Sequence, residues 1–221
     1  QALHRNPVDH ARIADEGHEI GHHGYCHENP ARMERDEEIA ILERGTSCLE
    51  QIAGVRPVGY RCPSGSASPN TVSLLTEHGF SYDSSMMADD FTPYYCRIGD
   101  DAPPDGPYSF GEQVDLVQMP FAWHLDDHPY FEHTASRRGV NPGLADPDRV
   151  LKIWLAEFEY LCRLGTGVFI VTMHPQVIGR GHRMLMLERL LDRLGQSEVA
   201  TFTTMAEAAD AWRSANPFAS D

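Results

Sequence analysis

Two histidines, His23 and His27, are spaced four residues apart within a stretch, residues 18–27, that contains four histidines. This spacing lets two imidazoles converge on one metal ion, and neutral imidazole is the commonest protein ligand for zinc and also suits other late first-row metals. Because a catalytic zinc usually takes three protein ligands and keeps one position open, the pair needs completion elsewhere. The alternative is a chance pair of solvated histidines, since the chain has 12 histidines.

The elements that must position this pair alternate along the chain. Strands are expected at about 19–21, 58–61, 80–83, 114–119, 168–173 and 199–202. Helices are expected from Asn6 as N-cap to Gly17, at about 36–53, 70–78, 146–164 and 183–194, and after the capping box Thr204-x-x-Glu207. The nearly continuous apolar run at 168–173 predicts a fully buried parallel strand. Alternating strands and helices predict an α/β fold with a parallel sheet, either open or closed as a barrel.

Polar clusters follow five of the predicted strands. In parallel α/β folds the active site lies at the C-terminal ends of the strands, so we expect these clusters to share one face. They contain His23 and His27, Arg61 and Pro63, residues 83–87, residues 120–127 with Trp123, and His174. The long segments 84–113 and 120–145 are rich in Pro, Asp and Gly, and loops of this length are usually functional. No Gly-rich phosphate loop follows a strand, so a dinucleotide-binding fold has no support.

Length and charge limit the classes of function. The 221 residues predict a single domain over 1–221 that is large enough for a sizeable core. The net charge of −15 argues against nucleic acid or an anionic membrane surface as partner, because phosphate binding needs clustered Lys and Arg. Without an apolar run of about 18 residues, no transmembrane helix is expected. A homo-oligomer stays open as a possibility.

The five cysteines indicate a reducing compartment. Their number is odd and no pair has C-x-x-C spacing, so a disulfide framework is not expected and a cytoplasmic location is favoured. Cys48 and Cys162 lie in helical patterns and are expected to pack as small hydrophobic residues.

Taken together, the motifs resemble the polysaccharide deacetylase family, the NodB-homology carbohydrate esterases. His23-x-x-x-His27 is similar to the second family motif, Arg61-x-Pro63 to the third, and residues 172–175 around His174 to the last. Segments 82–90, 123–131 and 174–183 resemble a subgroup of peptidoglycan-deacetylase-like, allantoinase-like and cyclic-imide-hydrolase-like proteins. The resemblance extends over almost the whole chain.

The resemblance implies a fold, a cofactor and a reaction. The fold would be an irregular (β/α) barrel of about seven parallel strands, similar to a TIM barrel. The cofactor would be a divalent metal, zinc above all, held by His23 and His27. The reaction would be hydrolysis of a non-peptide amide C–N bond, with His174 as general acid and Arg61 holding a base aspartate through charge-assisted hydrogen bonds.

The same resemblance suggests substrate-binding residues, each with a plainer alternative. Trp123 and Tyr130 would form an apolar wall for a sugar or ring, or else be core aromatics, and Pro63 of the third motif would also contact the substrate. Asp126 and Asp127 would bind substrate hydroxyl or NH groups, or else solvate a loop. The alternatives for Arg61 and His174 are a surface arginine and a hydrogen-bonded core histidine.

One departure from the family pattern is the first motif, an Asp-Asp pair that would supply the third metal ligand and the general base. It is not found before His23, and six strands are counted instead of seven. We expect an N-terminal truncation, and the rival interpretation is a protein without the catalytic machinery. In this chain Arg61 is then expected to be solvated or bonded to a substitute such as Asp83 or Asp126.

Three functions follow. The first is N-deacetylation of an N-acetylated glycan, the second is hydrolysis of a small cyclic amide or imide, and the third is an inactive family member that binds a partner. An open groove would favour a glycan, whereas a closed pocket would favour a small ring.

Overall fold

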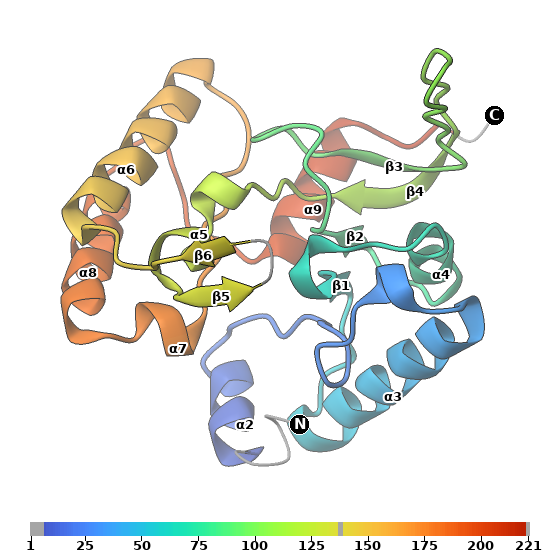
Figure 1. The fold of residues 1–221 in the computed structure, drawn as a ribbon, viewed down its shortest axis with the longest axis horizontal. Helices are drawn as coiled ribbons and strands as arrows, with labels where there is room; N and C mark the ends of the chain where they lie inside the picture. Colours follow the sequence, from blue (N-terminus) through green and yellow to red (C-terminus); the bar gives the residue numbers. More distant parts are fainter. Residues whose placement is uncertain (1–6, 137–138, 220–221) are drawn as a thin grey trace. The chain divides into compact units, whose positions relative to one another are not determined.

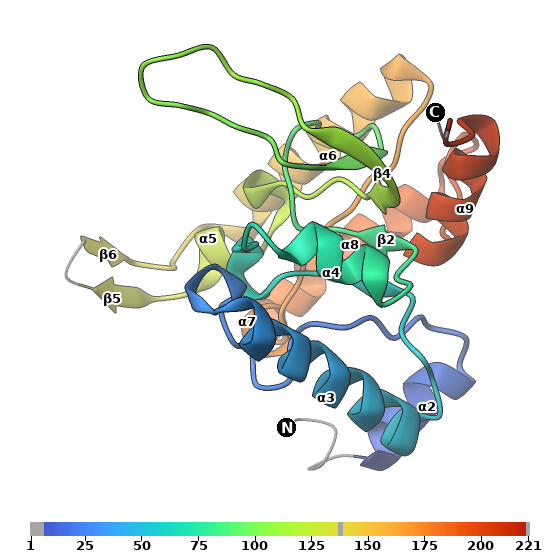
Figure 2. The ribbon, with the colours of Figure 1, turned by 90° about the vertical axis from the view of Figure 1, so that its right-hand side faces the viewer.

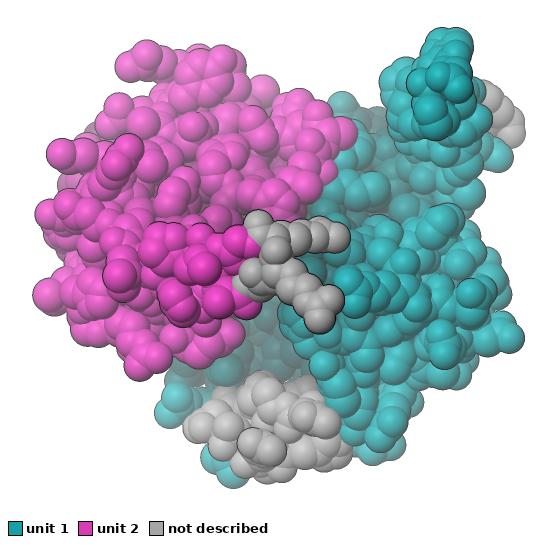
Figure 3. All heavy atoms as spheres, in the orientation of Figure 1, with its two compact units in different colours: residues 1–86, 93–119, 203–221 teal, residues 87–92, 120–202 magenta. Residues whose placement is uncertain are grey.

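The structure is a computed structural model that describes residues 7–136 and 139–219, so the expected N-cap Asn6 lies outside the described residues. The chain forms two compact units (Figures 1 and 3). The first comprises residues 1–86, 93–119 and 203–221, and the second comprises residues 87–92 and 120–202.

The first unit is built around a four-stranded sheet in the order β1-β2-β4-β3. Its strands are β1 (Gly59–Tyr60), β2 (Tyr82–Asp83), β3 (Tyr94–Ile98) and β4 (Glu112–Gln118). β1, β2 and β4 are parallel, with Tyr60 opposite Asp83 and Asp83 opposite Gln118. This confirms the predicted parallel sheet. The strand expected at 19–21 is reduced to one parallel bridge between His22 and Tyr60, one residue later than predicted.

The helices of the first unit agree closely with the sequence prediction. They are α2 (Pro7–Asp15), α3 (Arg35–Ala53), α4 (Thr71–Glu77) and α9 (Met205–Ala215), with short 3₁₀ turns at Pro30–Arg32 and Pro63–Gly65. The predicted capping box of α9 is confirmed, because Glu207 N donates to the Thr204 hydroxyl at 3.2 Å and Thr204 N donates to the Glu207 carboxylate at 3.0 Å. The buried core contains Leu42, Tyr60, Cys62, Val72, Leu74, Leu75, Phe80, Cys96 and Leu116.

The second unit is mainly helical. The long helices α6 (Pro147–Leu164) and α8 (Gly181–Gly195) lie side by side (Figure 1). Shorter pieces are the 3₁₀ turn Trp123–Leu125, α5 (His128–Phe131), α7 (Pro175–Ile178) and the hairpin β5 (Thr134–Ser136) and β6 (Gly139–Asn141). Asp146 caps α6 as predicted by accepting the Asp148 N–H at 2.9 Å. The buried core contains Phe91, Leu125, Phe131, Val150, Leu151, Trp154, Leu161, Val177, Ile178, Met186 and Leu190.

Two predicted strands are wrong. Within the part of the chain that the structure describes, residues 168–173 are half-buried and carry a single parallel bridge, between Thr172 and Asp126, and residues 199–202 have no strand pairing. An apolar run becomes a strand only where consecutive residues find a hydrogen-bonded neighbour, and at 168–173 the backbone bonds described are Val168 N to Phe91 O and two bonds around Thr172, which are not consecutive. Closure of a barrel of about seven strands stays a prediction.

The long segments expected to be irregular contain some regular structure. β3 lies within 84–113 and pairs antiparallel with β4, and the β5–β6 hairpin lies within 120–145. Between β3 and β4 the chain forms an exposed loop that reaches away from the sheet (Figure 2). Among the described helices, none combines the length and the hydrophobicity that crossing a membrane requires.

Candidate active site

The predicted metal pair lies in a loop of the first unit that follows the bridge residue His22. The rings of His23 and His27 are 5.0 Å apart between centroids and nearly perpendicular. His23 Nδ1 lies 2.7 Å from the carbonyl oxygen of Arg61. A carbonyl can only accept, so Nδ1 carries the proton and Nε2 carries the lone pair that a metal requires. The two imidazoles therefore fit a divalent metal that prefers nitrogen ligands.

The carboxylate of Glu28 shapes this loop. One of its oxygens accepts the backbone N–H groups of Tyr25 at 2.9 Å and Cys26 at 2.8 Å. Partial burial disfavours its charge, but these N–H donors outweigh that effect and lower the pKa of Glu28 below its usual value. The backbone of His27 has a positive φ of 62°, which costs free energy in a residue other than glycine. The turn that brings the two imidazoles together is thus held by Glu28 against local strain.

Pro63 and Gly24 meet beneath the same loop. Gly24 has φ of +70°, and a Cβ at this position would lie 3.2 Å from Pro63 Cγ and 3.0 Å from Glu28 Oε2. Pro63 is buried at the start of its 3₁₀ turn. Pro63 therefore packs against the loop that holds His23 and His27. This role is additional to the substrate contact that the resemblance implies for Pro63.

Arg61 follows β1 and bonds to the segment that follows β2. Its Nε donates to the backbone oxygen of Ser84 at 2.8 Å, and its terminal nitrogen donates to the Ser84 hydroxyl at 2.6 Å. The charge of Arg61 also lowers the pKa of Asp83, although burial dominates and raises that pKa to about 6. The sequence prediction expected solvent or a substitute carboxylate such as Asp83 or Asp126, but these hydrogen bonds of Arg61 go to Ser84, which was not predicted.

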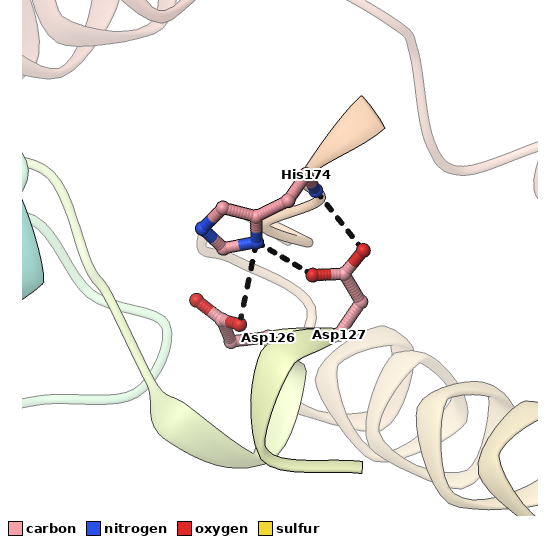
Figure 4. A group of neighbouring side chains, drawn as sticks. All are labelled: Asp126, Asp127 and His174. Atoms are coloured by element: carbon pink, nitrogen blue, oxygen red, sulfur yellow. Dashed lines mark hydrogen bonds and ion pairs between the residues drawn. The ribbon is translucent and has the colours of Figure 1, made fainter. Parts of the chain in front are cut away.

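The second unit contains a carboxylate and imidazole pair (Figure 4). His174 Nδ1 lies 2.6 Å from Asp127 Oδ1, and the His174 backbone N–H donates to Asp127 Oδ2 at 3.0 Å. Asp127 is fully buried, whereas the imidazole is partly exposed. A carboxylate that accepts the Nδ1 proton fixes the ring orientation and leaves Nε2 for proton exchange with a substrate.

Asp126 lies beside this pair but has another partner. Its Oδ1 accepts the His128 N–H at 2.7 Å and is 3.9 Å from His174 Nδ1. Burial raises the pKa of Asp126, and the His128 N–H and the charge of His174 oppose this shift. Asp126, Asp127 and His174 form the one group of three His, Cys, Asp or Glu in residues 7–136 and 139–219 whose ligand atoms lie close enough for a metal. The hydrogen bond between His174 Nδ1 and Asp127 engages two of the three ligand atoms. The group is therefore better described as a hydrogen-bonded pair with a neighbouring carboxylate, Asp126, than as a metal site.

Comparison with known proteins assigns the family. The family described as Polysaccharide deacetylase matches residues 1–82. The peptidoglycan deacetylase of Helicobacter pylori is 35% identical over 217 residues, which cover 93% of this chain and 73% of that protein. The chain belongs to the polysaccharide deacetylase family. Its members hydrolyse amide C–N bonds, and the family is in general metal-dependent.

Solved structures have the same fold. A polysaccharide deacetylase structure from Mycobacterium smegmatis aligns with a TM-score of 0.81 and 34% identity over 97% of this chain and 69% of that chain. The structure of Puue allantoinase aligns with a TM-score of 0.78 and 24% identity over 99% of this chain and 66% of that chain. The comparison with the allantoinase shows similarity of fold alone.

The remaining predicted substrate residues of this deacetylase differ in exposure. Trp123 is 42% exposed and packs edge-on against Phe121, with ring centroids 5.0 Å apart. Tyr130 is half-buried against Trp154, and its hydroxyl donates to the His124 backbone oxygen at 3.1 Å. Trp123 is therefore accessible to a ligand, whereas Tyr130 packs against the core of its unit.

Several residues that build the site were missed by the sequence prediction. Glu28 was not singled out, although it directly follows His27, and a carboxylate beside a metal-binding turn is a usable signal. His22 was counted among four histidines but is buried, with Nε2 3.2 Å from Leu42 O and Nδ1 accepting the Gly24 N–H at 3.2 Å. Burial lowers the pKa of His22 to about 4 and keeps it neutral, so its role is to anchor the loop.

Proposed function

We propose that this protein is a metal-dependent deacetylase that removes the acetyl group from an N-acetylated glycan. His23 and His27 hold the metal, zinc above all, and His174 is the general acid. The observation that carries the proposal is the hydrogen bond from His23 Nδ1 to the Arg61 carbonyl. It sets the tautomer of His23 in which Nε2 can bind a metal, and the His23 ring lies next to that of His27. The 35% identity to a protein named peptidoglycan deacetylase supports the glycan as substrate class.

Zinc bound at this pair would polarise the acyl oxygen and lower the pKa of a bound water toward about 7. Residues around the pair hold the two metal ligands in position. Glu28 holds the loop of the two ligands in its turn, and Arg61 supplies both the carbonyl for His23 and a guanidinium fastened to Ser84. These contacts preorganise the ligands before metal or substrate arrives.

His174 is proposed to protonate the leaving nitrogen through Nε2. Asp127 stabilises the imidazolium form and prevents ring rotation, because it accepts from both the ring and the backbone of His174. With both carboxylate oxygens engaged in this way, we assign Asp127 to positioning His174 rather than to binding substrate. Asp126, Trp123, Pro63 and Tyr130 remain the proposed substrate contacts.

The test is acetate release from N-acetylglucosamine oligomers by the zinc-loaded full-length protein. We expect a chelator to abolish the activity and added zinc to restore it. His23→Ala and His27→Ala should each remove most of the activity, whereas His18→Ala, which alters an exposed histidine of the same stretch, should not.

Two results would overturn the proposal. Acetate release that is unaffected by the chelator and by His23→Ala would remove the metal pair from the mechanism. Ring opening of a cyclic imide or of allantoin, with no acetate release from any glycan, would establish the second function and exclude the first.

A further inference from the structure

The peptide group that joins Arg61 to Cys62 is hydrogen-bonded at both ends. Its carbonyl oxygen accepts the Nδ1 proton of His23 at 2.7 Å, and its N–H donates to the Ser85 hydroxyl oxygen at 2.8 Å. The peptide unit is planar and rigid, with its donor and acceptor on opposite sides. The Arg61–Cys62 peptide group therefore forms a rigid hydrogen-bonded link between His23 and Ser85.

Ser85 in turn is bonded to a buried carboxylate. Its hydroxyl donates to Asp83 Oδ1 at 2.5 Å, and its backbone N–H donates to Asp83 Oδ2 at 3.1 Å. A hydroxyl has one proton, so donation to Asp83 leaves the oxygen lone pairs of Ser85 for the Cys62 N–H. Every donor in the series then points the same way, from His23 through the peptide and the hydroxyl to Asp83.

This series of hydrogen bonds lies in a low-dielectric environment at its inner end. Asp83 and Cys62 are each 1% exposed and Ser85 is 2% exposed. Hydrogen bonds that point the same way polarise one another, and the effect is stronger away from water. A charge on Asp83 therefore acts along the series toward the imidazole.

The strand register explains why these residues meet. Tyr60 at the end of β1 lies opposite Asp83 at the end of β2, so the two segments leave the parallel sheet side by side. Arg61 fastens the same two segments a second time through its bonds to Ser84. The position of the Arg61–Cys62 peptide is consequently defined by the segment that follows β2.

We propose that Asp83 and Ser85 are positioning residues for the metal ligand His23, acting through the Arg61–Cys62 peptide group. The inference rests on the proposed role of His23 as a ligand. Metal-binding histidines usually give their second N–H to a carboxylate or carbonyl, which fixes the tautomer and makes the ligating nitrogen more basic. Here the Arg61 carbonyl accepts the His23 Nδ1–H directly, and the Asp83 carboxylate lies at the other end of the series of hydrogen bonds.

A simpler role would be that Asp83 only closes the turn after β2 through its two bonds to Ser85. In that case its loss would lower the stability of the fold but leave the state of the His23 ring unchanged. The tautomer of His23 and the zinc affinity separate the two roles, and the tautomer can be read without any metal.

The experiment compares Ser85→Ala with the wild-type protein. In metal-free, ¹⁵N-labelled protein, long-range ¹H–¹⁵N spectra report the tautomer of His23, assigned with a His23→Gln sample. We expect the Nδ1–H form in the wild type and a mixture of both tautomers in Ser85→Ala. The zinc Kd, measured by competition with a chromophoric chelator, should weaken by about tenfold.

A matched control is Ser73→Ala in α4 of the same unit, where the hydroxyl donates to Asn70 O at 2.8 Å. It should change neither the tautomer nor the zinc Kd. Asp83→Asn keeps the shape but removes the charge, so it should weaken zinc binding while His23 keeps the Nδ1–H form.

Each outcome leads to a decision. A folded Ser85→Ala protein with the wild-type tautomer and zinc Kd would overturn the proposal, and if Ser85→Ala does not fold, an unchanged zinc Kd in Asp83→Asn would do so. A tautomer change in Ser85→Ala of a protein that binds no zinc would support the positioning role and refute the proposed function instead.

Discussion

His174 is attached to Asp127 by two hydrogen bonds, one from the ring Nδ1 at 2.6 Å and one from the backbone N–H at 3.0 Å. The buried carboxylate thus controls both where the backbone of His174 lies and how its ring is turned. Such an arrangement is expected of an imidazole that must present Nε2 in one direction. The two residues should behave as a unit in kinetics.

Replacing the proposed acid gives the first prediction. His174→Ala should lower kcat for acetate release by about 10²–10⁴-fold, the usual contribution of a general acid. His182→Ala, an exposed histidine in α8, is the control and should retain full activity. Unchanged turnover in His174→Ala would remove this residue from the mechanism.

The second prediction concerns the partner of the acid. Asp127→Asn should reduce kcat by roughly 10²–10⁴-fold with a smaller change in KM, because the amide stabilises the imidazolium less well than the carboxylate. The double variant with His174→Ala should be no worse than His174→Ala alone, since groups that act as a unit are not additive. Additive losses in steady-state kinetics would show that the two residues act separately.

Glu28 provides the third prediction. Glu28→Ala removes the acceptor for the N–H groups of Tyr25 and Cys26, so the loop of the metal pair should loosen. We expect a loss of about 1–3 kcal/mol in the free energy of unfolding and a weaker zinc Kd by roughly tenfold. Glu43→Ala, at an exposed position in α3, is the control for urea unfolding and zinc competition. A wild-type zinc Kd in Glu28→Ala would show that the turn forms without this carboxylate.

The fourth prediction reverses the usual effect of replacing a helical glycine. Gly45 lies in α3 against His22, and a Cβ there would be 2.1 Å from His22 Nε2. Gly45→Ala should therefore destabilise the protein by about 1–3 kcal/mol through overpacking, although alanine is favoured over glycine in helices. Gly195→Ala, at the last position of α8 with open space around it, should be neutral or slightly stabilising in thermal unfolding. A Gly45→Ala protein as stable as Gly195→Ala would mean that His22 does not pack against α3.

The fifth prediction concerns pH, because Asp83 and His22 affect stability in opposite directions. Burial raises the pKa of Asp83 from 3.8 to about 6, so the native state holds this proton more tightly than the unfolded chain. Its contribution to the free energy of unfolding falls as pH rises through that window. Burial lowers the pKa of His22 from 6.5 to about 4, so its contribution rises with pH between those values. In the wild type the two contributions should largely offset each other.

Asp83→Asn removes only the contribution of Asp83, the one that lowers the free energy of unfolding as pH rises. Relative to the wild type, the free energy of unfolding of Asp83→Asn should rise by on the order of 3 kcal/mol between about pH 4 and pH 6.5. Urea titrations at a series of pH values measure this difference. Parallel pH profiles for the two proteins would contradict the raised pKa of Asp83.

The sequence alone determined the elements whose signals are local. The helices α3, α6 and α9 were predicted within a few residues, because helical periodicity and caps such as Asp146 and the Thr204 and Glu207 box act over one or two turns. The spacing of His23 and His27 likewise identified a pair that the structure brings together. The family followed from motifs that are short and contiguous in the chain.

Only the tertiary structure decided which distant residues become partners. β3 was missed because it is defined by antiparallel pairing with β4, and the run at 168–173 was misjudged because hydrophobicity does not supply a neighbouring strand. The bonds of His23 to Arg61, of Cys62 to Ser85 and of His174 to Asp127 join residues 38, 23 and 47 positions apart. Such bonds depend on strand register and on packing, and a one-residue slip of β1 against β2 would break the bond between Cys62 and Ser85 that joins His23 to Asp83.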